Sequence, residues 1–112
     1  MIKRGEIYWV NLDPVVGSEI AKTRPNLVVS NDVNNQFSDT VTILPITSNV
    51  SKVYPFEVFL PRKLSGLKED SKVKADQIHT VDKRRLGKVA GTVQEELMEQ
   101  MEQALKLHLA LP

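Results

Sequence analysis

The chain lacks several features that would define a protein class. Its 112 residues include no cysteine, which excludes a disulfide framework and a thiolate metal site. No apolar run approaches the roughly 18 residues that a membrane-spanning helix needs. The first residues also lack the apolar segment and the small-residue cleavage site of a secretory signal peptide. These absences together favour a cytoplasmic protein.

Strong charge of one sign is also missing. The formal net charge is +1, which argues against a protein that coats nucleic acid through bulk charge. A locally basic face remains open, because cations cluster at two places in the chain. Most clusters of this kind are solvated surface, so composition does not decide between the two interpretations. The clusters consist of Lys83, Arg84, Arg85 and Lys88, and of Lys22 and Arg24.

The composition and length indicate one globular domain. With 41% hydrophobic and 26% charged residues, the composition is ordinary, and the length suits a single domain spanning residues 1–112. The sequence has neither an internal repeat nor a low-complexity linker. We therefore expect one modest core and no second catalytic domain.

Short segments rich in β-branched and aromatic residues predict a series of strands. The clearest are residues 6–12 and the alternating pattern at 56–60. Residues 40–46 also favour a strand, but Pro45 predicts that this strand lies at a sheet edge or bends there. The polar stretch 14–25 has no helical period and predicts a long loop, a feature that is often functional in so small a domain. Further strands are expected at 27–29, twice between 73 and 81, and at 88–93, with turns at Asn34-Asn35 and Ser65-Gly66.

The C-terminal segment has a different pattern. Apolar residues at spacings of three, four and one from Leu97 to Leu109 predict an amphipathic helix, and we expect His108 on its apolar face. Two starting points are open: Thr92 begins a capping box, or a strand runs through Val93 and the helix starts at Gln94. Short strands with one helix predict a mostly β, α+β fold, a small antiparallel barrel.

The apolar tail of this helix predicts self-association. It carries more apolar surface than one small core readily covers, and symmetric pairing is the common solution. A homodimer is therefore expected. The tail residues are Leu105, Leu107, Leu109 and Leu111.

The sequence contains few patterns of known catalytic chemistry. It has no nucleotide-binding glycine pattern, no nucleophile elbow and no carboxylate at ligand spacing from either histidine, so we expect neither metal nor cofactor. Polar residues at predicted strand ends remain, and by spacing alone these are more typical of turns and surface than of a site. They are Arg24, Thr47, Ser48, Asp76, Gln77 and His79.

An ordered set of short motifs resembles the MazF/PemK toxin family. Each motif alone is weak, but the set covers essentially the whole chain. The matching segments are Gly5-Glu6-Ile7-Tyr8-Trp9-Val10, Leu12-Asp13-Pro14, Gly17-Ser18-Glu19, Thr23-Arg24-Pro25, Pro45-Ile46-Thr47-Ser48, Tyr54-Pro55-Phe56-Glu57-Val58, Ala75-Asp76-Gln77-Ile78, Asp82-Lys83-Arg84-Arg85-Leu86-Gly87 and the closing helix.

The resemblance implies both a fold and a function. The fold would be an SH3-like barrel of the CcdB/PemK type with a C-terminal helix, assembled as a homodimer. The function would be that of a type II toxin: sequence-specific, metal-independent cleavage of single-stranded mRNA, neutralised by a cognate MazE-like antitoxin. Such an antitoxin would be an acidic, partly disordered peptide that folds onto the RNA-binding groove.

The resemblance also implies catalytic residues. Arg24 matches the arginine of the family's Arg-Pro motif, and Thr47 matches the threonine after the third strand, which are the usual catalytic pair. Glu19 matches an acidic residue linked to activity, and Asp76 matches the base of the Kid branch. Because this chain has Ser18 and Lys74 where Kid-like members carry histidine and arginine, the Kid assignment of base and acid is not transferred. The implied RNA-binding residues are Ser18, Lys22, Thr23, Ser48, Lys52, Lys74, Gln77 and His79.

The chemistry of RNA cleavage suits these residue types. The 2′-hydroxyl of RNA is the nucleophile, Arg24 offers charge and a forked donor array to the phosphate, and Thr47 offers a hydrogen bond to a phosphoryl oxygen. The general base stays open between Glu19 and Asp76. Two competing interpretations are a CcdB-like toxin that binds DNA gyrase and a non-catalytic RNA-binding barrel.

Overall fold

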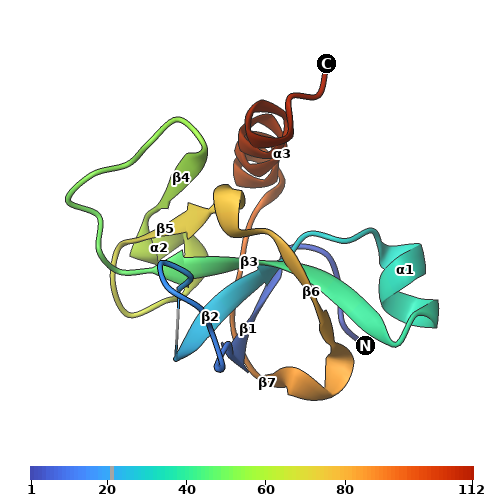
Figure 1. Cartoon of the computed structure of the whole chain (residues 1–112). Coiled ribbons are helices and arrows are strands. Elements are labelled where there is room, and N and C mark those ends of the chain that lie inside the picture. Colours follow the sequence, from blue (N-terminus) through green and yellow to red (C-terminus); the bar gives the residue numbers. More distant parts are fainter. Residues whose placement is uncertain (21) are drawn as a thin grey trace.

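A computed structural model describes residues 1–20 and 22–112, and in this part of the chain seven antiparallel strands form a curved sheet (Figure 1). The strand order is β4-β5-β3-β2-β1-β7, and β6 also pairs with β3. The strands are β1 (Glu6–Asn11), β2 (Thr23–Val28), β3 (Thr40–Thr47), β4 (Glu57–Leu60), β5 (Ser71–Lys74), β6 (His79–Asp82) and β7 (Leu86–Thr92). The helices are α1 (Asp32–Phe37), α2 (Arg62–Ser65) and α3 (Glu95–Leu109), with the 3-10 turns η1 (Ala75–Gln77) and η2 (Lys83–Arg85).

The central strands bury side chains on both faces of the sheet, because successive residues point to opposite faces and β2 and β3 carry consecutive buried residues. In β2, Leu27 belongs to a cluster that packs under α3, whereas Val28 belongs to a cluster on the opposite face. Val15 and Ile20, from the segment between β1 and β2, pack against this second cluster. The antiparallel sheet with its closing helix confirms the predicted mostly β fold.

The strand that contains Pro45 is central, so of the two predicted alternatives, an edge position or a bend, the edge position is wrong. β3 pairs with β2 on one side, and on the other it pairs first with β6, through Thr40–Ile43, and then with β5, through Ile46 and Thr47. Pro45 lies between these two segments, where β3 changes partner. Its missing N–H therefore removes no hydrogen bond from either ladder.

The helix α3 begins later than a capping box at Thr92 would place it. Thr92 pairs with Glu6 in the sheet, and Gln94 is the N-cap without a side-chain hydrogen bond, so the capping-box alternative is wrong. The other alternative is correct to within one residue, since β7 ends at Thr92 and α3 begins at Glu95. The C-terminal part of α3 points away from the sheet (Figure 1), and His108 and Leu109 are exposed there instead of lying on a buried face. Among the described residues, no helix is long and apolar enough to cross a membrane.

Two predicted connections also differ from the structure. Asn34-Asn35 is not a turn but lies in α1, because Asn31 caps this helix by accepting from the backbone N–H of Asn34 at 2.8 Å. The predicted loop 14–25 is too long, since β2 already begins at Thr23. At Ser65-Gly66 the chain does turn, with Gly66 ending α2 at a φ of 83°.

Candidate functional site

The two residues of the predicted catalytic pair lie at the same end of the sheet. β2 and β3 are antiparallel, so the start of β2, with Arg24, lies beside the end of β3, with Thr47. The register pairs Asn26 with Pro45, and its continuation by two residues brings Arg24 opposite Thr47. Both side chains are partly exposed, as a site for an RNA phosphate requires.

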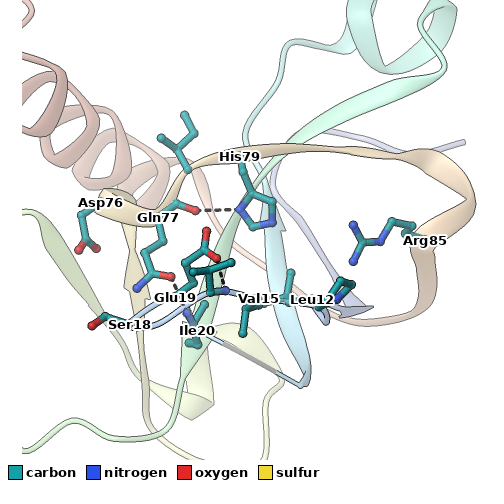
Figure 2. A pocket seen from close by; sticks show the side chains of 12 residues that line it. Leu12, Val15, Ser18, Glu19, Ile20, Asp76, Gln77, His79 and Arg85 are labelled. Carbon is teal, nitrogen blue, oxygen red and sulfur yellow. Dashed lines mark hydrogen bonds between the residues drawn. The ribbon is translucent and has the colours of Figure 1, made fainter.

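A cavity of about 530 Å³ lies between the β1–β2 segment and η1, in the size range of small-molecule sites (Figure 2). Hydrophobic side chains form one part of its wall, and polar groups from both segments point into it. Of the predicted site residues, the cavity is lined by Ser18, Glu19, Asp76, Gln77 and His79. Arg85, which was named only as part of a basic cluster, also lines it.

The loop that forms this wall is held by specific hydrogen bonds. Glu19 Oε1 accepts from the backbone N–H of Val16 at 2.5 Å, so one carboxylate oxygen is used within the loop itself. Gln77 Oε1 accepts from the backbone N–H of Ile20 at 2.8 Å, which ties the loop to η1. Among the described residues, no hydrogen bond engages the other oxygen of Glu19 or the amide N–H₂ group of Gln77, so both can meet a ligand.

One carboxylate oxygen in the wall is buried without a partner. Asp76 Oδ1 has no hydrogen bond within the part of the chain that the structure describes. Leaving a buried acceptor unsatisfied costs about 1–3 kcal/mol, so such an atom is expected to meet a water or a ligand donor. Close by, His79 Nδ1 lies 2.9 Å from the backbone carbonyl of Gln77 (Figure 2).

Sequence reasoning missed an ion cluster on β4 and β5, which we call the Glu57 triad: Glu57, Lys72 and Lys74. The ammonium of Lys72 lies 2.9 Å from Glu57 Oε1 and that of Lys74 lies 2.6 Å from Oε2. The carboxylate also accepts from the backbone N–H of Tyr54, and Lys72 donates to the carbonyl of Lys52 at 2.6 Å. Through these bonds to Lys52 and Tyr54, the triad holds the segment that follows Thr47 in place. Thr47 itself pairs with Lys72 in the sheet.

The triad also fixes the charge state of its carboxylate. Burial raises the pKa of Glu57, but the hydrogen bonds from Lys74, the Tyr54 backbone and Lys72 outweigh this effect and hold the pKa below its usual range. Lys74 was predicted to bind RNA, and its ammonium is directed to Glu57. A usable signal was the i, i+2 spacing of Lys72 and Lys74, which puts both side chains on one face of a strand.

Five predicted RNA-binding residues lie outside the lining of the cavity. Lys52 is exposed, and its ammonium lies 5.0 Å from the centroid of the Tyr54 ring, which stacks on Phe56. In residues 1–20 and 22–112, no three histidine or acidic side chains are grouped to hold a metal ion. The five residues outside the lining are Lys22, Thr23, Ser48, Lys52 and Lys74.

Comparison with known proteins identifies the family. Residues 3–109 match the family described as PemK-like, MazF-like toxin of type II toxin-antitoxin system. The chain is 44% identical over 116 residues to endoribonuclease MazF9 of Mycobacterium tuberculosis, covering 99% of this chain and 98% of that protein.

Solved structures agree with this match. The crystal structure of MazF from Deinococcus radiodurans has a TM-score of 0.85 at 29% identity and covers 98% of this chain and 97% of that chain. An endoribonuclease in complex with its cognate antitoxin from Mycobacterial species has a TM-score of 0.82 at 27% identity, with 100% and 98% covered. From its sequence match and its shared fold, the chain belongs to the PemK-like, MazF-like toxin family of type II toxin–antitoxin systems.

Proposed function

We propose that this toxin is an endoribonuclease that cleaves single-stranded mRNA at specific sequences in the cytoplasm. The observation that carries the proposal is the placement of Arg24 and Thr47 at one end of the sheet. A relative with 44% identity is named an endoribonuclease, which supports the same activity here. Gyrase binding, the alternative considered from the sequence, would not need the chemistry of Arg24 and Thr47.

In the proposed reaction the RNA supplies its own nucleophile. The 2′-oxygen forms a bond to phosphorus while the bond from phosphorus to the 5′-oxygen breaks, which yields a 2′,3′-cyclic phosphate and a 5′-hydroxyl. The guanidinium of Arg24 stabilises the extra charge on the phosphoryl oxygens, and the hydroxyl of Thr47 donates a hydrogen bond to one of them. Because an arginine supplies the positive charge, we propose that the reaction needs no metal.

The general base is proposed to be Asp76 or Glu19. Asp76 has a buried oxygen without a partner among the described residues, whereas one oxygen of Glu19 already accepts from Val16. Asp76→Asn and Glu19→Gln keep the shape of each side chain and remove its basicity. Comparing their single-turnover rates will identify the base, because general base catalysis contributes about 10²–10⁴-fold.

The remaining predicted residues are proposed to bind the RNA around this centre. Ser18, Gln77 and His79 offer polar groups to a base in the cavity. Outside the cavity, cationic and hydroxyl groups suit the phosphate backbone. These outer residues are Lys22, Thr23, Ser48, Lys52 and Lys74.

The test is cleavage of labelled RNA by the pure protein in excess EDTA. We expect a cyclic phosphate at one product end, and no reaction when the nucleotide at the cut carries 2′-deoxyribose. Cleavage of the deoxy substrate at the same bond would exclude the mechanism. A protein that leaves RNA intact but inhibits gyrase would instead support the CcdB-like alternative.

Two partners complete the proposal. A cognate antitoxin is expected, because a related endoribonuclease has been solved in complex with one. Self-association is proposed from the exposed leucines at and just beyond the end of α3, of which Leu107 is 57% and Leu111 is 56% accessible. Co-expression with the product of the adjacent reading frame tests the first partner. Light scattering tests the second, and a monomer mass at micromolar concentration would contradict it.

A further inference from the structure

The cavity beside η1 has a fixed pattern of hydrogen-bonding groups, and His79 is its clearest member. The partner of His79 Nδ1 is the backbone carbonyl of Gln77, at 2.9 Å. A carbonyl only accepts hydrogen bonds, so Nδ1 carries the proton. In the neutral ring Nε2 is then an acceptor. Since His79 lines the cavity and is half-buried, this acceptor is positioned for a ligand there.

Two carboxylates add further acceptors to the same wall. In the described part of the chain, Asp76 Oδ1 is buried and without a partner, and one oxygen of Glu19 accepts a hydrogen bond, from the backbone N–H of Val16. The backbone N–H of Ile20 donates to the side-chain oxygen of the nearby Gln77 and so fixes the orientation of its amide. The N–H₂ group of Gln77 is then the donor that faces a ligand. Figure 2 shows the side chains of Glu19, Gln77 and His79 grouped together, with Asp76 to one side.

The one cation of the wall is directed elsewhere. Arg85 lines the cavity at a distance from Asp76 and Glu19 in Figure 2. Its Nη2 donates to the backbone carbonyl of Asn11 and, at 3.4 Å, to that of Asp13. Arg85 therefore leaves the buried oxygen of Asp76, the half-buried Nε2 of His79 and the exposed carboxylate of Glu19 as acceptors to which a ligand can donate.

From this excess of acceptors we infer that the cavity binds one RNA base with an exocyclic amino group and discriminates against uracil. The inference rests on the proposed nuclease function. An amino group of adenine, cytosine or guanine carries two N–H bonds. It can donate to His79 Nε2 and to whichever carboxylate of Asp76 and Glu19 does not act as the general base. Uracil carries a single N–H at its pairing edge, so binding uracil leaves one of these two acceptors unpaired inside the occupied cavity.

In the same geometry, the N–H₂ group of Gln77 also contributes to recognition of the base. Adenine and cytosine have a ring nitrogen acceptor next to the amino group, and the Gln77 N–H₂ group can donate to it. His79 and Gln77 are thus specificity-determining residues, whereas Arg24 and Thr47 act on the phosphate.

The experiment compares two substitutions of His79 that separate its nitrogens. His79→Asn retains a donor for the Gln77 carbonyl but lacks any group at the place of Nε2. His79→Gln reaches that place with an amide oxygen but lacks the Nδ1 donor. His108→Asn is the matched control, since His108 is exposed on α3 and does not line the cavity.

Each protein is assayed on a randomised RNA pool, by cleavage and by binding. We expect wild type and the control to disfavour uracil at one position by about tenfold, the factor for one unpaired acceptor. His79→Asn should lose this preference through a change in KM, with kcat at saturating RNA within about threefold. His79→Gln should retain part of it. At that position, replacing adenosine by purine riboside, which lacks only the amino group, should weaken binding to wild type.

The outcomes separate this inference from the proposed function. If wild type cleaves RNA but His79→Asn retains every base preference, the inference is overturned and the nuclease assignment stands. An unchanged affinity for purine riboside would overturn it as well. If wild type does not cleave RNA but its bound pool still disfavours uracil in a His79-dependent way, the recognition site is supported and the nuclease function fails.

Discussion

Two neighbouring groups of charged side chains differ in how completely their hydrogen bonds are made. In the Glu57 triad, the carboxylate accepts from two ammonium groups and one backbone N–H, and its side chain is inaccessible to solvent. Around the cavity, Asp76 Oδ1 has no partner within the described residues. Burial without partners costs stability and is retained where a ligand completes the bonds. We therefore infer that the Glu57 carboxylate stabilises the fold, whereas the cavity is suited to binding a ligand.

The largest effect on stability is expected from a substitution in the Glu57 triad. Glu57→Gln leaves two partly buried ammonium groups without their carboxylate, so we expect a loss of about 3–5 kcal/mol in the free energy of unfolding. Urea unfolding monitored by circular dichroism measures it. Glu102→Gln is the matched control. The side chains of Glu102 and Arg4 are 48% and 30% accessible, respectively, so their ion pair should contribute less than about 1 kcal/mol.

The pH dependence of the same variant sharpens this prediction. Because the pKa of Glu57 is lowered in the folded protein, its contribution is present above the ordinary glutamate pKa and is lost as pH falls through the folded value. The stability difference between wild type and Glu57→Gln should therefore shrink in acid. A difference that stays constant from pH 7 to pH 3 would contradict this account of the triad.

A smaller free-energy effect, limited to activity, is expected at the strand ends. Arg24→Ala and Thr47→Ala each remove a group that contacts the phosphate in the proposed reaction, so single-turnover cleavage should slow by about 10²–10³-fold. Both residues are partly exposed, so the folded structure should persist. Arg62→Ala, which removes the same charge from exposed α2, is the control. Near-wild-type cleavage by either variant would show that the pair is misassigned.

The contrast between the two regions also explains what the sequence could predict. Local patterns determine the strand at 6–12 and the helix from Leu97, and the ordered motifs place Arg24 and Thr47 at strand ends, where the structure has them. The Glu57 triad depends on the register between β4 and β5, which pairs Glu57 with Lys74 and which no local pattern encodes.

Two errors have the same kind of cause. Asn34-Asn35 favours a turn by propensity, but the cap from Asn31 and the burial of Asn35 against Ser30 stabilise a helix there. Pro45 is disfavoured in a central strand, but β3 changes partner at that residue. In both cases tertiary contacts outweigh a local preference.

The smallest effect is expected at Tyr8, a buried residue of the second core cluster whose hydroxyl donates to Glu6 Oε1 at 2.9 Å. Burial, with the adjacent Glu6 carboxylate, raises the pKa of Tyr8 to about 12. A raised folded pKa means that the contribution is complete below the ordinary value of about 10 and is lost as pH rises through about 12. Tyr8→Phe should cost about 1 kcal/mol at pH 7 and remove this alkaline loss.

The chain has two tyrosines, so Tyr54→Phe leaves Tyr8 as the only one and allows its titration to be followed by absorbance at alkaline pH. Ionisation of Tyr8 near pH 10 in the folded protein would mean that its hydroxyl is neither buried nor bound to Glu6.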